Sequence, residues 1–300
     1  MEADTEDEDS EEEGGPEREG PETYRSKNGE ILWSSIPPPQ TQGRARAEEI
    51  RRNSPGPSRC ACVRAEYIKS TFELFFPSSM QKMLLEMTNL EGQRVFGDEW
   101  CNVDWDEIQA FIGLLILAGV LKSHHESASS LWDSEMGIFC TTMPLKKFKR
   151  LTRILRFDDK RSRAARREKD KLAPIREMWE RWVERLPLMY RPEINITVDE
   201  SLVGFRGRCP FKQYMPKKTA KYGIKIWAAC DAKTSYCFNM QVYTGKPPGM
   251  PHERNLGKRI VLEMSNDLQG HIVTCDNFFT SYTLGSDVLM KKIKIDRNDP

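Results

Sequence analysis

Two aspartates, each at the end of a short alternating segment, are the residues of this sequence best suited to chemistry. Asp199 ends ITVD and Asp276 ends HIVTCD. Two carboxylates held close together repel each other, and a divalent cation relieves the repulsion. Mg²⁺ binds carboxylates together with phosphate oxygens and water, and a pair of such ions can catalyse phosphodiester transfer. Strand-end aspartates are also common in turns and caps, so a purely structural role stays open.

The segment between the two aspartates is basic. From position 206 to 225 there are seven Lys or Arg and no Asp or Glu, interleaved with aromatic residues and glycines. This composition suits a phosphate backbone that passes close to the main chain, with rings available to unpaired bases. A basic hairpin exposed for solubility would look the same. The predicted DNA contacts are Arg206, Arg208, Lys212, Lys217, Lys218, Lys221 and Lys225.

The elements around these residues form a mixed α/β region, residues 191–300. Apolar alternation predicts a strand that ends at Asp199, followed by antiparallel strands at 222–230 and 235–245. A helix at about 254–268, a strand at 271–276 and a helix at 281–292 come next. If the strand ending at Asp276 pairs parallel to the first, a right-handed crossover brings both aspartates to one sheet edge. Glu200 is then predicted to point to the opposite face, as a weaker candidate ligand.

Residues 63–190 have helical periodicity and predict an all-α region, so the fold class is α+β or α/β. One helix, MPLKKFKRLTRILRF at 143–157, has an apolar stripe and is otherwise basic. Its outward bases are further candidate DNA contacts, namely Lys146, Lys149, Arg150 and Arg153. The tracts KKFKR and RSRAARR could equally be nuclear import signals, a DNA-binding face or solvated helix surface.

Charge is distributed unevenly along the 300 residues, although 46 bases and 45 acids leave a net charge of +1. Nine of the first thirteen residues are acidic, and residues 1–62 are predicted to be a disordered tail, acidic and then rich in proline and arginine. The longest apolar run, at 111–121, is shorter than the roughly 18–20 residues of a membrane span. We therefore expect no membrane anchor. No C-x-x-C pair occurs, so we expect no zinc site. We also expect no small-molecule cofactor.

Two long motifs resemble the hallmark segments of piggyBac-type transposases and their domesticated derivatives. They are TVDESLVGFRGRCPFKQYMPKKTAKYGIKIW and TCDNFFTS, and LTRILRFDDK and KLAPIREMWE are also similar to family segments. The resemblance runs from about 64 to 290. It implies that Asp199 and Asp276 are the first two aspartates of an RNase H-like DDE/DDD centre that holds Mg²⁺ or Mn²⁺. It further implies cut-and-paste DNA transposition at TTAA sites, a nuclear location, and a helical DNA-binding and dimerisation region, hence a homodimer.

The sequence departs from that family after Asp276. Only 24 residues follow, and none of Asp287, Asp296 and Asp299 has plausible spacing for a third catalytic carboxylate. The ending KIKIDRNDP is less apolar than the strand expected there, and no Cys/His-rich zinc module follows. We therefore expect a C-terminally truncated protein with an incomplete RNase H-like domain and an absent or impaired activity. The alternatives are a host DNA-binding or chromatin-associated protein without nuclease activity, and a fragment without a function.

Overall fold

The structure is a computed structural model that describes residues 22–27, 29, 31–36, 54–121, 126–133, 137–246 and 253–297. Most of the tail that the sequence predicts to be disordered lies outside these residues, as does Asp299. The chain divides into two compact units, Met1–Ala45 and Arg46–Pro300. In the first unit, β1 (Thr23–Arg25) and β2 (Leu32–Ser34) form an antiparallel hairpin.

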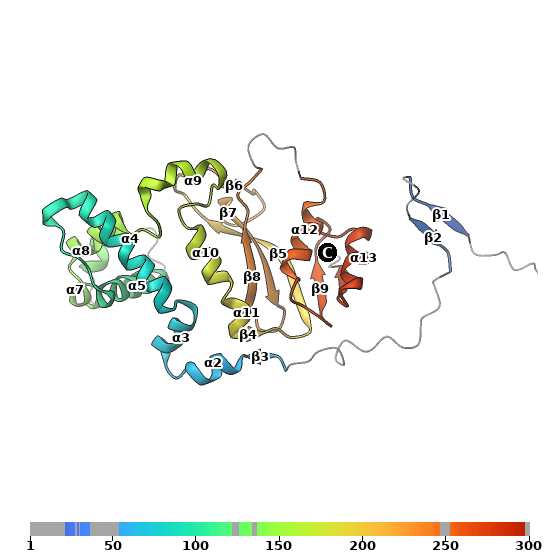
Figure 1. Cartoon of the computed structure of the whole chain (residues 1–300), viewed down its shortest axis with the longest axis horizontal. Coiled ribbons are helices and arrows are strands. Elements are labelled where there is room, and N and C mark those ends of the chain that lie inside the picture. Colours follow the sequence, from blue (N-terminus) through green and yellow to red (C-terminus); the bar gives the residue numbers. More distant parts are fainter. Residues whose placement is uncertain are drawn as a thin grey trace, which may run out of the picture. The chain divides into compact units, whose positions relative to one another are not determined.

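The second unit holds the remaining described elements, in which helices come before most of the strands (Figure 1). The helices are α2 (Arg59–Arg64), α3 (Ile68–Phe75), α4 (Ser78–Phe96), η1 (Gly97–Glu99), α5 (Trp105–Val120), α6 (Ala128–Trp132), α7 (Ile138–Thr142), α8 (Leu145–Ile154), η2 (Lys160–Ser162), α9 (Arg163–Lys169), α10 (Arg176–Val183), α11 (Leu186–Met189), α12 (Leu256–Met264) and α13 (Tyr282–Met290). The strands are β3 (Gly56–Pro57), β4 (Tyr190–Arg191), β5 (Asn195–Gly204), β6 (Gln213–Tyr214), β7 (Tyr222–Asp231), β8 (Cys237–Val242), β9 (Ile272–Cys275) and β10 (Lys294–Arg297). None of these helices is long and apolar enough to cross a membrane.

The predicted disorder of residues 1–62 is wrong for the β1–β2 hairpin and for the last part of that segment. Strand β3 pairs antiparallel with β4, and the backbone N–H of Ser58 donates to the carbonyl of Met189 at 2.8 Å. The Ser58 hydroxyl caps α2 by accepting from the Ala61 N–H, and Ala61 is buried in a small cluster with Leu74 and Met189. These contacts are made to residues far away in sequence, so local composition does not reveal them.

The helical part is built on an apolar core, as the periodicity predicts. The predicted stripe of α8 is buried, with Phe148, Leu151 and Ile154 packed among residues of α4 and α5 such as Leu84 and Phe111. Helix α5 is capped by Asp104, whose carboxylate accepts from the Glu107 N–H at 2.9 Å. Short strands β3 and β4 bound this region, so its all-α character holds for α2–α11 only.

The sheet has β5 at its centre. Strand β7 pairs antiparallel with β5 on one side, and β9 pairs parallel with it on the other. Strands β6 and β8 both pair with the far side of β7, and β10 extends the other edge by pairing parallel with β9. The antiparallel β7–β8 pair is as predicted, and the parallel β5–β9 pairing, on which the meeting of the two aspartates was conditional, is present. The crossover between β5 and β9 includes α12.

Within the ending KIKIDRNDP, residues Lys294–Arg297 form strand β10, although the segment is less apolar than the strand expected there. Ile293 is fully buried and Ile295 packs against the sheet core, whereas the lysine between them is exposed. Such a strand is buried on one face and exposed on the other, so its sequence alternates instead of being continuously apolar. The polar residues at the edge therefore do not argue against a strand here.

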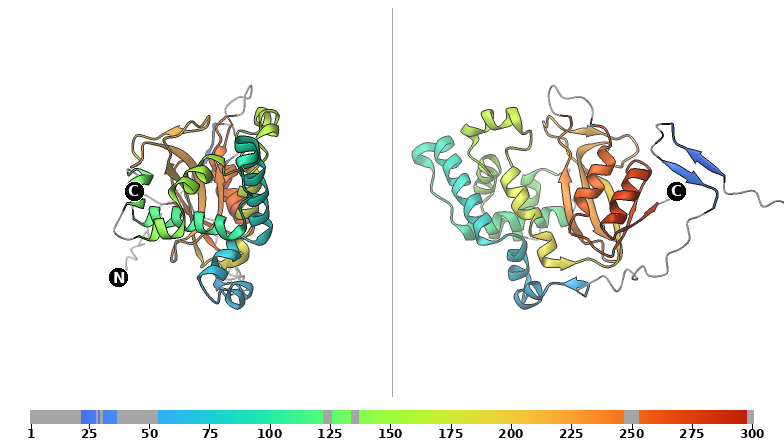
Figure 2. Two further views of the ribbon diagram at one scale, coloured as in Figure 1. Left: turned by 90° about the vertical axis from the view of Figure 1, so that its left-hand side faces the viewer. Right: turned by 45° about the vertical axis from the view of Figure 1, so that its right-hand side comes forward.

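Two helices cover one face of the sheet. Figures 1 and 2 show α12 and α13 side by side on that face, with α10 and α11 beyond the other. The buried core beneath α12 and α13 includes Ile196 and Val198 of β5, Val273 of β9 and Ile260 of α12, all fully buried. On the other side, the Tyr236 hydroxyl donates to the Leu186 carbonyl at 2.9 Å.

A glycine sets how closely α12 approaches the loop after β9. A Cβ at Gly257 would lie 2.5 Å from the Phe278 carbonyl oxygen and 2.8 Å from the Phe279 Cα. Both atoms belong to the backbone, which cannot rotate away as a side chain can. The residue that follows β9, Asp276, is therefore held in a loop against which α12 packs without any intervening side chain.

We expect Gly257→Ala to lower the free energy of unfolding by about 1–3 kcal/mol, because the added methyl overlaps backbone atoms. The matched control is Gly113→Ala in α5, where a Cβ meets nothing within 4 Å. Removing a helical glycine there should raise stability by about 0.5–1 kcal/mol. Urea unfolding of both variants checks the pair, and equal changes would contradict the packing at Gly257.

The turn between β7 and β8 is organised by a buried carboxylate. Asp231 accepts from the backbone N–H groups of Glu193, Lys233 and Thr234 at 2.7, 2.8 and 3.0 Å. Burial raises the pKa of Asp231, but the three N–H bonds outweigh it, so the pKa lies below its ordinary value. One of these bonds links the turn to the segment just before β5.

We expect Asp231→Asn to lower the free energy of unfolding at neutral pH by about 1–3 kcal/mol. The folded-state pKa is depressed, so the stabilisation by Asp231 is complete above the pKa of the unfolded chain. It is lost as the pH falls through the folded-state pKa. Urea unfolding should therefore show a larger gap between wild type and variant at neutral pH than at about pH 3. A gap that does not change with pH would contradict this role.

Candidate functional site

The parallel pairing of β5 and β9 brings the two predicted aspartates together. The last paired residues are Val198 and Cys275, so Asp199 is the next residue of β5 and Asp276 is the first residue after β9. The predicted strand end at Asp199 is wrong, because β5 continues to Gly204 in its pairing with β7. One ligand atom from each of Asp199, Glu200 and Asp276 can be chosen such that all three lie within 4.8 Å of one another. Among the residues that the structure describes, no other group of three His, Cys, Asp or Glu has this arrangement.

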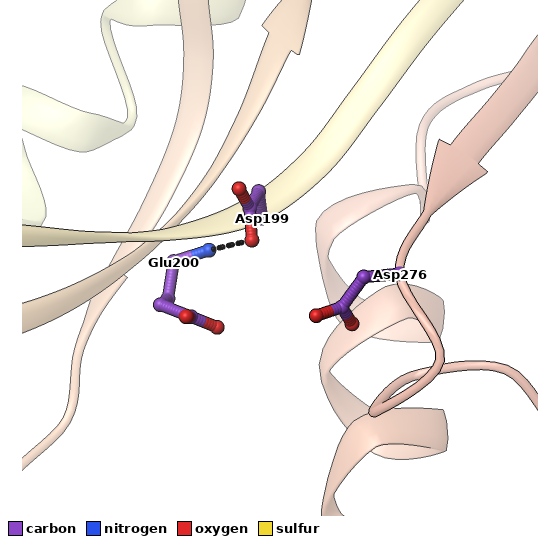
Figure 3. Close-up of side chains that lie close together, drawn as sticks. All are labelled: Asp199, Glu200 and Asp276. Atoms are coloured by element: carbon purple, nitrogen blue, oxygen red, sulfur yellow. Dashed lines mark hydrogen bonds between the residues drawn. The ribbon is translucent and has the colours of Figure 1, made fainter. Parts of the chain in front are cut away.

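Glu200 points to the face of β5 opposite to that of Asp199, as predicted, but its ranking as the weaker candidate ligand is wrong, because it joins the cluster. Glu200 lies on the face of β5 that carries Ile196 and Val198, and the loop after Asp276 folds over that face to bury Phe279. The carboxylates of Glu200 and Asp276 therefore point toward one another (Figure 3). Asp276 lies beyond the end of β9, where strand alternation no longer determines the direction of a side chain.

Hydrogen bonds to nearby residues of the chain orient the two aspartates. The Asp199 Oδ1 accepts from the Glu200 N–H at 2.7 Å, as drawn in Figure 3. The Asp276 Oδ1 accepts from the Phe278 N–H at 3.0 Å, and the Asp276 carbonyl accepts from the Thr280 hydroxyl at 2.8 Å. These bonds close a turn of the TCDNFFTS segment on itself. Each aspartate keeps carboxylate oxygens that can bind something else, and both residues are exposed.

Two of the predicted DNA-binding lysines are instead next to Glu200. The Lys218 Nζ lies 3.5 Å from Glu200 Oε1, and the Lys225 Nζ lies 3.7 Å from Glu200 Oε2. The Lys225 side chain is only 16% exposed, and that of Lys218 is 37% exposed. Lys225 therefore faces the acidic cluster, and Lys218 is shared between the cluster and solvent.

The other bases of the 206–225 segment are mostly exposed. Arg206, Arg208, Lys217 and Lys221 are exposed, whereas Lys212 is half-buried and donates to the Gly207 carbonyl at 3.3 Å. The rings of Tyr214 and Tyr222 lie 4.7 Å apart and are both exposed, at 57% and 53%. This surface combines positive charge with accessible aromatic rings, as the composition predicts.

The four candidate bases of α8 lie on a helix that packs in the helical core, whereas the acidic cluster lies on strands of the sheet core. Lys146, Lys149 and Arg153 are exposed, and Arg150 is half-buried. The guanidinium groups of Arg150 and Arg153 lie 4.9 and 5.6 Å from the centre of the Phe96 ring. Arg150 also pairs with Glu99 at 3.3 Å, so part of this positive charge is balanced by a neighbouring surface acid.

The remaining C-terminal acids do not join the cluster in the described structure. Asp287 pairs with Lys258 at 2.8 Å, and Asp296 lies in β10. The third carboxylate of the cluster is Glu200, which the sequence placed next to Asp199 from the start. In the sequence, the evidence for Glu200 as a ligand was its position next to Asp199. The evidence against it was strand alternation, which places neighbouring side chains on opposite faces.

The donor set fits a hard divalent cation. All three groups offer carboxylate oxygens, which are the ligands that Mg²⁺ and Mn²⁺ bind in preference to nitrogen or sulfur. The acids are also close enough that side-chain rotation could direct them to one ion. The lysines at Glu200 act against such an ion, because they carry the same sign of charge.

Comparison with known proteins gives a consistent result. The family model described as Transposase IS4 matches residues 69–295. The human PiggyBac transposable element-derived protein 3 and the human Chimeric ERCC6-PGBD3 protein are each 26% identical over 227 residues. That alignment covers 71% of this chain, but 36% and 20% of those proteins. The chain thus spans about a third or less of these curated relatives.

A solved structure supports the same assignment. It is the piggyBac transposase synaptic complex with hairpin DNA, with a TM-score of 0.74 and 34% sequence identity. The match covers 82% of this chain and 52% of that chain. The family match extends over most of the sequence and includes both aspartates and Glu200. The chain therefore belongs to the Transposase IS4 family, and within it to the piggyBac type.

Proposed function

We propose that this chain binds DNA and that its acidic cluster holds a divalent cation for chemistry on DNA phosphodiesters. The observation that supports it most is the meeting of Asp199, Glu200 and Asp276 at the point where the parallel pairing of β5 with β9 stops. The cation is Mg²⁺, or Mn²⁺ in its place. Such an ion, when bound, supplies Lewis acidity and lowers the pKa of a bound water or hydroxyl.

In this proposal, residues at different positions around the cluster have different roles. Asp199 and Asp276 direct carboxylate oxygens into the cluster, and their orientation is held by the N–H bonds from Glu200 and Phe278. The exposed bases of the 206–225 segment hold the phosphate backbone beside it without reading base sequence. The exposed rings of Tyr214 and Tyr222 offer stacking surfaces to unpaired bases.

The role of the rest of the chain follows from the family. We propose that residues 63–190 form a DNA-binding and dimerisation region, that the protein is a homodimer and that it acts in the nucleus. The exposed bases of α8 would contact DNA, and DNA transposition at TTAA would be the reaction of the whole family member. Residues 191–300 correspond to the RNase H-like part in this proposal.

The metal site is tested by removing both aspartates. We expect the double variant Asp199→Asn plus Asp276→Asn to bind Mn²⁺ at least about tenfold more weakly, because two of three anionic donors are lost. Isothermal titration measures this directly. The control is Asp296→Asn in β10, which should bind Mn²⁺ as the wild type does. Unchanged affinity in the double variant would exclude this site.

Activity is tested on the same proteins with a labelled hairpin DNA and Mg²⁺ or Mn²⁺. Nicking that depends on the metal and on both aspartates supports the phosphodiester chemistry. If no nicking occurs at any protein concentration, this chain does not catalyse the step and the second candidate function applies. That candidate is DNA binding without nuclease activity, and it is favoured by the lysines that already pair with Glu200.

DNA binding is tested by its dependence on salt. We expect Arg206→Ala and Lys217→Ala each to reduce the slope of log affinity against log salt by about 1, because each removes one phosphate contact. Lys82→Ala is the control, since the exposed Lys82 of α4 pairs with Glu86. Binding that survives in the Asn double variant separates DNA retention from metal binding. Slopes unaffected by Arg206 and Lys217 would place the DNA surface elsewhere.

A further inference from the structure

Lys225 places a positive charge inside the acidic cluster. Its ammonium lies 3.7 Å from Glu200 Oε2 and is flanked by two aromatic rings, with 5.6 Å to the Trp227 centroid and 5.4 Å to the Phe278 centroid. The side chains of Lys225 and Glu200 are only 16% and 15% exposed. The rings attract the cation, and the limited access of water keeps its field from being screened.

Strand register holds this lysine in place. Glu200 is paired with Trp227 and Leu202 with Lys225, so Lys225 and Glu200 are diagonal neighbours on one face of the sheet. Lys218 adds a second cation from the turn before β7. Its Nζ lies 3.5 Å from Glu200 Oε1 and donates to the Glu200 carbonyl at 3.3 Å. Both oxygens of Glu200 therefore have an ammonium partner.

These two lysines change the charge that an incoming ion encounters. Three ionised carboxylates alone would present three negative charges, and two ammonium groups beside Glu200 offset two of them. An ammonium group has no lone pair with which to bind a metal, so it can only repel one.

We propose that Lys225, assisted by Lys218, is a built-in counter-cation that occupies Glu200 and competes with a divalent metal for the acidic cluster. This inference rests on the proposed metal site. Metal binding then requires Glu200 to exchange its lysine partners for the ion. The cluster is thereby stable without metal, and its affinity for metal is kept low.

A purely supporting role for Lys225 predicts the opposite result. If the lysine only positioned Glu200 for the metal, its removal would loosen the carboxylate and weaken metal binding. If the lysine competes, its removal leaves Glu200 free to bind and strengthens metal binding. The sign of the change in affinity therefore distinguishes the two roles.

The test is Lys225→Met, which keeps an unbranched apolar chain between the two rings and removes the charge. We expect the variant to bind Mn²⁺ about tenfold more tightly than the wild type in isothermal titration, with a smaller gain at high salt. Lys218→Met should give a smaller gain in affinity, because Lys218 is more exposed. Lys294→Met is the matched control, since Lys294 is an exposed lysine of β10 in the same sheet, and should give none.

Unchanged or weaker Mn²⁺ binding by Lys225→Met would overturn the inference. Lys225→Arg, which keeps the charge, should bind as the wild type does, and a gain in that variant would also contradict it. Circular dichroism melting establishes that each variant folds. If Lys225→Met does not fold, the sign of the change in Lys218→Met decides the question.

The inference and the proposed metal site fail in different ways. If the Asn double variant loses Mn²⁺ binding but Lys225→Met shows no gain, only the competition is wrong. If the double variant binds Mn²⁺ as the wild type does, the ion binds elsewhere, and both the metal site and the competition are wrong. A gain in Lys225→Met that disappears when both aspartates are replaced supports the two together.

Discussion

The parallel pairing of β5 with β9 is the constraint on which the site depends. Parallel neighbours cannot be joined by a tight turn, so the chain must cross the sheet between them, and α12 lies in that crossover. The crossover carries Gly257 into contact with the backbone of the loop after Asp276. The same pairing that places the two aspartates side by side thus also determines which helix supports them.

Electrostatics divides the basic residues of this chain into two kinds. Lys218 and Lys225 are paired with Glu200 inside the cluster, whereas bases such as Arg206 and Lys217 are exposed around it. The first kind reduces the local negative charge, and the second attracts a polyanion to the same region. A segment that is uniformly basic in sequence therefore has two functions in the proposed scheme, and burial separates them.

Much of the fold could be predicted from periodicity. The buried stripe of α8, the cap of α5, the antiparallel β7–β8 pair and the position of α12 all follow from local patterns. The failures occur where burial depends on a distant partner. Residues 54–62 are ordered by contacts with 186–191, and β10 is a strand because Ile295, together with Ile293 just before it, packs on the sheet core.

The sequence by itself determined the candidate chemistry: two aspartates that each follow an alternating apolar segment, the basic segment between them and the resemblance to a transposase family. Only the tertiary structure decided that Glu200 joins the aspartates and that Lys225 faces inward. The physical reason is that alternation specifies the face of a sheet on which a side chain lies, but not which loop covers that face. The loop after Asp276 folds onto the face of Glu200, and this contact is invisible in the local pattern of either segment.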